Sequence, residues 1–329
     1  MIGTCFGTIL TATYRDQFLG EPIAPFYLHV GNLNGICGWG RKLSGRCASI
    51  VAKLLNLPCF LLEDGFLRSC GLGVEKSPLL SIVVDDLGIY YDASRPSRLE
   101  HLINALVLDE TLQSQAADAL NLIRQHRLSK YNHAPEWQLP NLTENAQTRV
   151  LVIDQTLNDL SVRLGGANKK VFAQMLAAAI AENPGAEIWV KTHPDVLSGK
   201  KQGYLGHLNL KSSIYLLAEN ISPLCLLEQI DKVYVATSQM GFEALMLHKP
   251  VVCFGQPWYA GWGLTEDRHP KMEKLRSRRS SKRTLEQLFA AAYLQYPRYI
   301  QPETGQLGTI FDVIAWLMQY KISAQQHEK

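Results

Sequence analysis

Polar and ionisable residues follow three predicted strands in the second half of this sequence. The apolar runs 150–153, 188–190 and 232–236 are typical of strands buried on both faces, and each ends in polar residues. In an open parallel sheet, ligands bind at the carboxyl ends of the strands. The residues expected there are Gln155, Thr156, Asp159, Lys191, His193, Pro194, Ser238, Gln239, Gly241 and Glu243. We therefore predict a site for a donor nucleotide at this edge of the sheet.

Two of these positions have a defined local geometry. Pro194 disfavours helical backbone at His193 and so leaves the imidazole at a strand tip. Ser238 is expected at a helix start, where unpaired N–H groups and the helix dipole bind an anion. Gly241 would allow close approach of the ligand, and Glu243 would accept hydrogen bonds from ribose hydroxyls. The alternative is an ordinary Ser-capped helix with Glu243 in solvent, but three polar strand tips together favour the ligand site.

Adjacent carboxylates also occur in the first half, at Glu63 and Asp64, after the short apolar run 59–62. Such a pair can bind a metal, act as a general acid and base, or form a turn. Its position before a glycine-rich loop that carries Arg68 favours a functional role. The second acidic pair, in segment 85–88, we assign to a turn, which is the commonest role of Asp next to Gly.

The elements that must position these residues alternate along the chain. Apolar residues at helical spacing predict a helix around 171–180, and Ser222-Pro223 predicts the start of another that runs to Ile230. A third helix is expected over 240–247. A fourth strand is expected over 251–254. Four strands with three connecting helices make one Rossmann-like half.

Length and composition indicate an enzyme of two domains. At 329 residues the chain exceeds the size at which one core usually stops growing, and 47% of its residues are hydrophobic. We expect an N-terminal acceptor-side domain over 1–145 and a C-terminal donor-binding domain over 146–329. Whether the final helix returns to the N-terminal domain stays open.

Other function classes are disfavoured by the composition. A net charge of +3 is too small to imply nucleic-acid binding. The seven cysteines include no Cys-x-x-Cys pair, which argues against a zinc cluster or a disulfide framework and fits a reducing cytoplasm. No apolar run approaches the ~20 residues of a membrane span, and the first residues lack the pattern of a signal peptide.

Segment 274–283 is strongly basic, with six cations in ten residues. It could hold the protein at an anionic bilayer at about 1 kcal/mol per cation. The alternatives are a solvated basic loop, or a loop that folds back on an acidic acceptor path. Nucleic acid is disfavoured because no aromatic residues are interleaved with the charges.

Seven motifs occur in order along nearly the whole chain. They are Gly-Trp-Gly-Arg-Lys (38–42), Glu-Asp-Gly-Phe-Leu-Arg-Ser (63–69), Val-Asp-Asp-Leu-Gly-Ile-Tyr-Tyr-Asp (84–92), Ser-Lys-Tyr-Asn (129–132), Lys-Thr-His-Pro-Asp-Val (191–196), Thr-Ser-Gln-Met-Gly-Phe-Glu-Ala-Leu (237–245) and Gly-Gln-Pro-Trp-Tyr-Ala-Gly-Trp-Gly (255–263). Together these motifs resemble those of one known family, the KpsC/LipB capsular-polysaccharide β-Kdo transferases of Gram-negative bacteria.

The resemblance implies an α/β protein of the GT-B class, with two Rossmann-like domains facing each other across a cleft. It implies transfer of Kdo from CMP-β-Kdo, with retention of anomeric configuration, to a Kdo-bearing acceptor linked to phosphatidylglycerol. No cofactor and no metal are expected. Family members usually carry two such modules in one chain, and this one resembles the N-terminal module. The implied location is cytoplasmic, peripheral on the inner membrane, with segment 274–283 contacting the anionic surface.

The family pattern also assigns roles to residues. Asp159 would be the nucleophile, although Asn158 replaces the usual glycine before it. One of Glu63 and Asp64, preferably Asp64, would act as acid/base at the acceptor hydroxyl. The leaving phosphate would be held by His193 and Lys191, together with the Ser238 helix end. The acceptor side would include Arg41, Lys42 and Arg68.

Two other readings remain open at this point. A nucleotide-sugar epimerase of GT-B architecture would release free product from the donor alone. A non-catalytic module would bind CMP or glycan without transfer. The motifs do not distinguish a 2,4 from a 2,7 linkage.

Overall fold

The computed structural model describes residues 1–5, 15–28, 30–71, 77–144, 146–192, 196, 202–205 and 214–327. The chain forms two compact units. The first contains residues 1–90, 95–133 and 286–329, and the second contains 91–94 and 134–285. Segment 134–145, expected with the N-terminal domain, therefore lies in the second unit, and the last 44 residues lie in the first.

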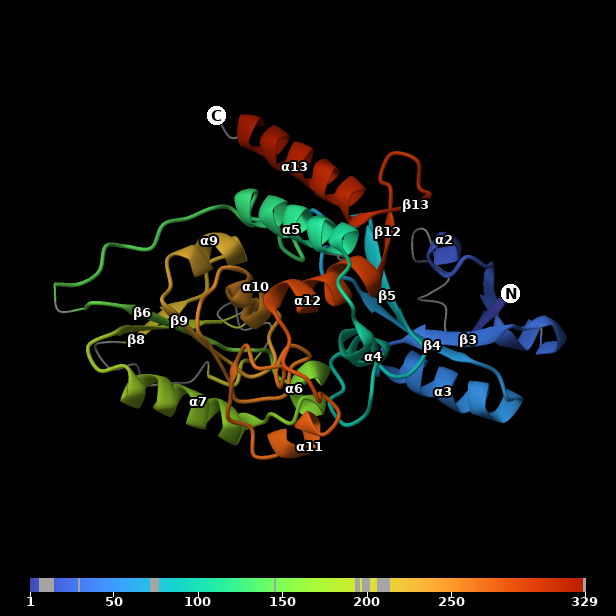
Figure 1. The fold of residues 1–329 in the computed structure, drawn as a ribbon, viewed down its shortest axis with the longest axis horizontal. Coiled ribbons are helices and arrows are strands. Elements are labelled where there is room, and N and C mark those ends of the chain that lie inside the picture. The colour runs from blue at the N-terminus through green and yellow to red at the C-terminus, as the bar shows by residue number, and fades with distance from the viewer. Residues whose placement is uncertain are drawn as a thin grey trace. The chain divides into compact units, whose positions relative to one another are not determined.

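The first unit is built on a mixed sheet of seven strands in the order β13-β12-β5-β4-β3-β1-β2 (Figure 1). Strands β2, β1, β3 and β4 are parallel to one another. Strand β5 is antiparallel to β4, β12 is antiparallel to β5, and β13 is antiparallel to β12. The strands are β1 (Ile2–Thr4), β2 (Ile23–Pro25), β3 (Gly35–Trp39), β4 (Cys59–Asp64), β5 (Ser81–Asp85), β12 (Pro297–Ile300) and β13 (Leu307–Gly308). The helices are α2 (Arg15–Leu19), α3 (Leu43–Leu55), α4 (Arg98–Ala105), α5 (Glu110–Gln125), α12 (Leu285–Phe289) and α13 (Ile310–His327), with a π-helical segment at Ala290–Gln295.

The second unit is built on a fully parallel sheet of six strands in the order β11-β10-β9-β6-β7-β8. The strands are β6 (Arg149–Ile153), β7 (Glu187–Lys191), β8 (Ile214–Leu217), β9 (Lys232–Val235), β10 (Val251–Cys253) and β11 (Glu266–Asp267). The helices are α6 (Leu160–Leu164), α7 (Lys169–Glu182), α9 (Pro223–Glu228), α10 (Met240–Met246) and α11 (Met272–Arg276).

The strand order places a topological switch point in the second unit. From β6 the chain proceeds outward through β7 and β8, then returns to pair β9 with β6 and continues in the opposite direction to β10 and β11. In open α/β sheets, the crevice outside the carboxyl ends of the strands at such a point is the usual ligand site. The ends of β6 and β9 are therefore where a ligand is expected.

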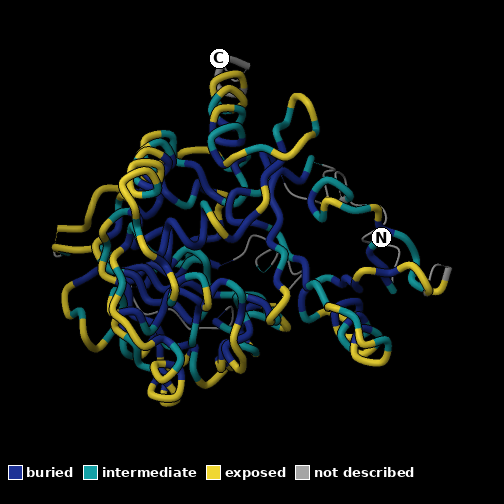
Figure 2. Tube along the Cα trace, turned by 45° about the vertical axis from the view of Figure 1, so that its right-hand side comes forward, coloured by how far each residue is buried: buried dark blue, intermediate teal, exposed yellow. Residues whose placement is uncertain are grey.

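The cores follow from the apolar runs that predicted the strands. Val150, Val152, Ile188 and Val190 are almost fully buried and pack with Phe172 of α7 in one cluster. These buried segments are dark blue in Figure 2. The four strands and three helices expected in this half are present, whereas β8, β11, α6 and α11 are additional.

Local signals define the helix ends. Asn168 caps α7 by accepting from the N–H groups of Lys170 and Val171. Ser97 caps α4 in the same way by accepting from the N–H of Glu100. Ser222 occupies the expected position before α9, but its side chain makes no capping hydrogen bond. Within the described ranges, no helix is both long and apolar enough to cross a membrane.

Candidate functional site

Asp159 lies at the switch point, in the loop between β6 and α6. Its Oδ1 accepts hydrogen bonds from the N–H and the hydroxyl of Ser161, each at 2.8 Å, so Asp159 is the N-cap of α6. Its Oδ2 lies 3.3 Å from the amide Nε2 of Gln155. One carboxylate oxygen is thus used for capping, and the other contacts an amide donor.

Gln155 connects the ends of β6 and β9. Its Oε1 accepts from both the N–H and the hydroxyl of Thr237, each at 3.1 Å. Ser161 completes the network, because its hydroxyl lies 3.3 Å from the Thr237 hydroxyl. Asp159 is therefore tied, through Gln155 and Ser161, to the residue that follows β9.

Asn158, which replaces the glycine usual in the family, has a backbone conformation that both residue types readily adopt. Asn158 has a φ of +69°, in the left-handed region that Gly and Asn adopt most readily. The N–H of Asp159 donates to the carbonyl of Thr156, which also forms an antiparallel bridge with Gly203. Replacing glycine by Asn158 thus leaves a closed turn in front of Asp159.

Buried Asp154 fixes the start of this loop. Its carboxylate accepts from the N–H groups of Gln155, Tyr204 and Leu205 and from the Thr192 hydroxyl. Burial raises the pKa of Asp154, and these hydrogen bonds act in the opposite direction. Asp154 therefore has a structural role, joining the end of β6 to segment 202–205.

Lys191 ends β7, and its ammonium group points to backbone oxygens. The Nζ donates to the carbonyl of Glu219 at 2.8 Å and contacts that of Thr192 at 3.4 Å. Burial lowers the pKa of Lys191 to about 8, and the Glu219 carboxylate offsets only part of this effect. His193 and Pro194, also predicted in the donor site, lie outside the described residues.

The segment after β9 is held largely by aromatic residues of the second unit. Gln239 is the N-cap of α10, and its Oε1 accepts from the Trp258 indole at 3.0 Å. The Ser238 carbonyl accepts from the buried Tyr259 hydroxyl. The Ser238 Oγ accepts from the N–H of Met240 at 3.3 Å. Helix α10 therefore begins one residue later than a Ser238 cap would place it.

Gly241 and Glu243 lie inside this helix. A Cβ at Gly241 would come within 2.1 Å of the Tyr259 hydroxyl, so close packing of the tyrosine by itself requires glycine here. Glu243 is 3% exposed, and its charge contributes to the raised pKa of Tyr259, which comes mainly from burial. The solvent-exposed alternative considered for Glu243 is therefore wrong.

In the first unit, Glu63 lies near the carboxyl end of the central strand β4. Its Oε1 accepts from the Trp39 indole at 2.9 Å and from the N–H of Asp64 at 3.2 Å. Burial raises the pKa of Glu63, and the positive charges of Lys130 and Lys42 oppose that shift. Trp39 was not singled out from the sequence, although it belongs to the Gly-Trp-Gly-Arg-Lys motif.

Asp64 has cationic and phenolic neighbours instead. The Arg68 Nε lies 3.0 Å from Oδ1 in an ion pair whose geometry falls outside that of a hydrogen bond. The Tyr131 hydroxyl donates to Oδ2 in a long contact of 3.4 Å. Burial lowers the pKa of Lys130, but Asp64, Tyr131 and Glu63 together outweigh it and raise the pKa. The ammonium form of Lys130 is therefore favoured beside the carboxylates.

The Ser-Lys-Tyr-Asn motif packs against the loop that follows Asp64. The Asn132 side chain donates to the carbonyls of Ser69 and Ser129, and its Oδ1 accepts from the N–H of Ser129. The Lys130 carbonyl accepts from the N–H of Arg68, and Ser69 pairs with Tyr131 in a parallel bridge. These backbone contacts bring Lys130 and Tyr131 to Asp64, which sequence reasoning had not predicted.

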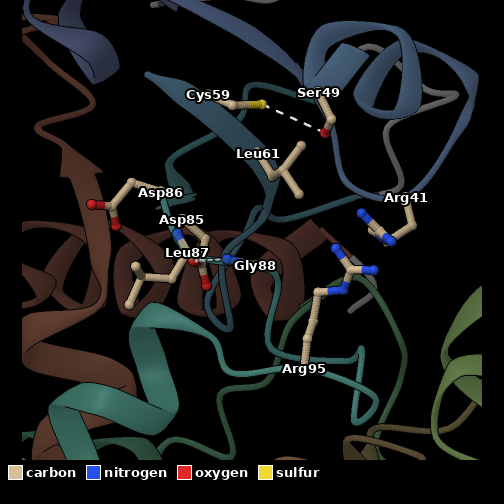
Figure 3. A pocket seen from close by; sticks show the side chains of 9 residues that line it. All are labelled: Arg41, Ser49, Cys59, Leu61, Asp85, Asp86, Leu87, Gly88 and Arg95. Carbon is tan, nitrogen blue, oxygen red and sulfur yellow. Dashed lines mark hydrogen bonds between the residues drawn. The ribbon is translucent and has the colours of Figure 1, made fainter. Parts of the chain in front are cut away.

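The predicted acceptor-side cations occupy two places. Arg68 lies at Asp64, and Lys42 is close enough to affect Glu63. Arg41 instead lines a small cavity of about 70 Å³. Figure 3 shows its guanidinium turned toward that of Arg95, with Ser49 and Cys59 on the opposite side.

The second acidic pair forms a turn, as assigned from the sequence. Asp85 is fully buried and accepts from the N–H groups of Leu87, Gly88 and Arg98 and from the Tyr296 hydroxyl. Asp86 forms an ion pair with the Arg98 side chain at 2.6 Å. Both carboxylates are engaged in holding the chain after β5.

The basic segment 274–283 is not uniformly solvated. Arg279 is 5% exposed, donates to the carbonyls of Pro257 and Ala260, and lies 5.5 Å from the Trp262 ring centroid. Arg276 contacts the Asp267 carboxylate at 3.4 Å. Arg279 therefore stabilises the tryptophan-rich turn 257–262, and only part of the segment is available to a partner.

Comparison with known proteins supports the resemblance. Residues 34–299 match the family described as capsule polysaccharide biosynthesis protein. The chain is 54% identical over 291 residues to the capsule polysaccharide modification protein LipA of Neisseria meningitidis serogroup A. The aligned region covers 87% of this chain and 41% of LipA. It is 39% identical over 270 residues to the lipopolysaccharide-processing protein LpsZ of Rhizobium meliloti, covering 82% of this chain and 60% of LpsZ. The chain thus spans about two fifths of the length of LipA.

Two solved structures are similar over nearly the whole chain. The β-Kdo 2,4 transferase of Thermosulfurimonas dismutans KpsC has 47% identity and a TM-score of 0.89, covering 96% of this chain and 97% of that one. The β-Kdo 2,7 transferase of the same KpsC has 28% identity and a TM-score of 0.71, covering 94% and 95%. The expected α/β fold of the GT-B class is confirmed by the first match. The chain belongs to the capsule polysaccharide biosynthesis protein family and is of the KpsC/LipB type.

Proposed function

We propose that this chain is a retaining β-Kdo glycosyltransferase that takes Kdo from CMP-β-Kdo. The observation that carries the proposal is the polar network of Asp159, Gln155, Ser161 and Thr237 at the switch point of a parallel sheet. The similarity to the KpsC β-Kdo 2,4 transferase supports the substrate class. Because the 2,4 module is more similar than the 2,7 module, in both identity and TM-score, we propose a 2,4 linkage.

The proposed reaction is a double displacement at the anomeric carbon of Kdo. An Asp159 oxygen attacks that carbon as its bond to the CMP phosphate breaks, and CMP leaves with the bonding electrons. The acceptor hydroxyl then attacks the same carbon, gives its proton to Asp64, and releases the Asp159 carboxylate. Since Oδ1 of Asp159 caps α6, Oδ2 is the proposed nucleophilic atom.

Charge on the departing phosphate requires cations and N–H donors nearby. We assign this role to His193, Lys191 and the backbone around Ser238, and ribose recognition to Glu243. Preorganised groups of this kind supply several kcal/mol of transition-state stabilisation. The scheme requires no metal ion.

We further propose that the acceptor is a Kdo-bearing lipid of the phosphatidylglycerol type at the cytoplasmic face of the inner membrane. The exposed cations of segment 274–283, such as Lys274 and Lys282, would contact the anionic surface. A second transferase module is proposed to belong to the same protein, in keeping with the greater length of LipA.

One experiment tests the transferase proposal directly. The chain is incubated with CMP-β-Kdo generated in situ and a soluble acceptor that ends in Kdo, and the product is analysed by mass and by NMR linkage assignment. We expect one added Kdo in β-configuration at the 4-hydroxyl. Free sugar product from donor alone would indicate an epimerase, and CMP binding without product would indicate a non-catalytic module; either result overturns the proposal.

A further inference from the structure

The second unit contains a cavity of about 640 Å³ outside the switch-point network. Its walls come from α6, the start of α7, segment 269–271 and α11, which lie side by side in Figure 1. This volume falls within the roughly 300–1,000 Å³ that small-molecule sites occupy. The cavity is therefore large enough for an organic ligand.

The lining of this cavity is strongly cationic. The charged side chains are Arg163, Lys170, Lys271, Lys274 and Arg278, and the described lining residues include no aspartate or glutamate. Within the described part of the chain, no carboxylate forms an ion pair with Arg163, Lys170, Lys271 or Lys274. Other cations of the same unit are neutralised, as Arg149 is by Glu187 and Arg268 is by Glu182. The lining of the cavity thus concentrates positive charge.

The walls are fixed by hydrogen bonds. A ring nitrogen of the buried His269 lies 3.1 Å from the carbonyl of Gly166, and its other nitrogen accepts from the N–H of Lys271. Gly166 has a φ of +77°, and a Cβ there would meet His269 at 2.6 Å. Arg278 donates to the carbonyl of Ala93. The cations therefore stand on a preorganised frame, which limits the entropy lost when a ligand binds.

The helix dipole of α7 favours an anion in the cavity. Asn168 already caps the N–H groups of Lys170 and Val171, so these groups serve the helix rather than a ligand. The positive end of this 14-residue helix still faces the cavity side on which Lys170 and Gln174 lie. Direct contacts to an anion would come from the lysine and arginine side chains.

We propose that this cavity is a binding site for a phosphate-bearing anion. Arginine and lysine provide charge-assisted hydrogen bonds to phosphate oxygens, and a lining that carries five of them and, among its described residues, no carboxylate matches that chemistry. The phosphate can belong to a lipid headgroup, to a nucleotide or to free phosphate. Asp159, Gln155, Ser161 and Thr237 do not line this cavity. Binding here does not depend on the proposed Kdo transfer.

The test compares two double variants with equal loss of charge. K170Q/K271Q removes two cations of the cavity that lie outside the basic segment 274–283. K53Q/K169Q is the matched control, because Lys53 and Lys169 are exposed and do not line the cavity. Both variants are first checked for wild-type circular dichroism and thermal unfolding temperature.

Each protein is titrated by calorimetry with inorganic phosphate, CMP and glycerophosphoglycerol at about 0.15 M ionic strength, where distant charges are screened. Co-sedimentation uses phosphatidylcholine vesicles with and without phosphatidylglycerol. We expect the cavity variant to weaken binding of at least one probe by about tenfold or more, since each substitution removes a charge-assisted hydrogen bond. The control should bind like wild type.

The affected probe identifies the source of the phosphate. Loss confined to CMP indicates a nucleotide, loss of glycerophosphoglycerol and of phosphatidylglycerol vesicles indicates a lipid headgroup, and loss of all the soluble probes alike indicates phosphate itself. Equal weakening in the two double variants, or no probe affected by the cavity variant, overturns the proposal. Because no Kdo is present, failure here is distinguishable from failure of the transferase proposal.

Discussion

The side-chain oxygen of Gln155 accepts hydrogen bonds from both the N–H and the hydroxyl of Thr237, each at 3.1 Å. These two residues follow neighbouring strands, β6 and β9, across which the chain reverses its direction of strand addition. The amide of the same glutamine contacts Asp159. The placement of Asp159 therefore depends on the pairing of two strand ends.

Gln155→Leu should misplace Asp159 without unfolding the protein. We expect kcat to fall by roughly tenfold to a hundredfold, since small displacements of a reacting group have effects of this size, while the KM for the donor changes little. Thr237→Val removes one of the same hydrogen bonds. The two changes should be non-additive in a double-variant cycle measured by kcat, and strict additivity would contradict the network.

Asp159→Asn separates the two roles of this carboxylate. Asn is as good an N-cap as Asp, so stability should remain at the wild-type level while transfer is lost. Asp159→Ala should lose transfer and also about 1 kcal/mol in the free energy of unfolding. Urea denaturation and a Kdo-transfer assay measure both effects. An active Asp159→Asn enzyme would leave Asp159 as a capping residue only.

Asp64→Asn and Glu63→Gln should differ strongly in activity. Asp64 contacts Arg68 and Tyr131, whereas one Glu63 oxygen already accepts from Trp39 and from the chain. We expect Asp64→Asn to lower transfer by roughly a hundredfold or more, as for removal of a general base, and Glu63→Gln to cost little. The reverse order would assign the acid/base role to Glu63.

Stability should depend on pH through Lys191. Its pKa in the folded protein is about 8, below the value of 10.5 usual for lysine, because the amine is buried. The folded state thus favours the neutral amine. That contribution to stability is present above pH 10.5 and is lost as pH falls through about 8. Relative to wild type, Lys191→Met should therefore gain more in the free energy of unfolding at pH 7 than at pH 10.5. A pH-independent difference between the two proteins would refute this assignment.

Gly241→Ala should destabilise the second unit by steric overlap. The new Cβ would lie 2.1 Å from the Tyr259 hydroxyl, and overpacking of this kind costs about 1–3 kcal/mol. Adding Tyr259→Phe should recover part of the loss, because the hydroxyl is the nearest atom. Gly31→Ala, with no atom within 4 Å of its Cβ, is the control for a glycine substitution in thermal unfolding. Lack of rescue by Tyr259→Phe would count against this cause.

Much of the second unit could be predicted because its signals are local. A strand buried on both faces needs a continuous apolar run, and 150–153 and 188–190 supplied it. The asparagine at 158 could be expected to adopt a left-handed turn from its residue type alone. The family motifs indicated the fold class and the substrate class, and the comparisons confirmed the family.

The tertiary structure decided the contacts between distant segments. Gln155 and Thr237 are 82 positions apart, and Tyr131 and Asp64 are 67 apart, so no local pattern specifies either pair. The cationic cavity likewise collects residues between 93 and 278 that share no motif. Strand β12 pairs with β5, which is distant in the sequence. The hydroxyl of Tyr296, just before β12, donates to Asp85 at the end of β5, 211 positions away. Periodicity in a sequence reports which face of an element is buried, but the register and order of strands depend on packing between elements, which only the folded chain fixes.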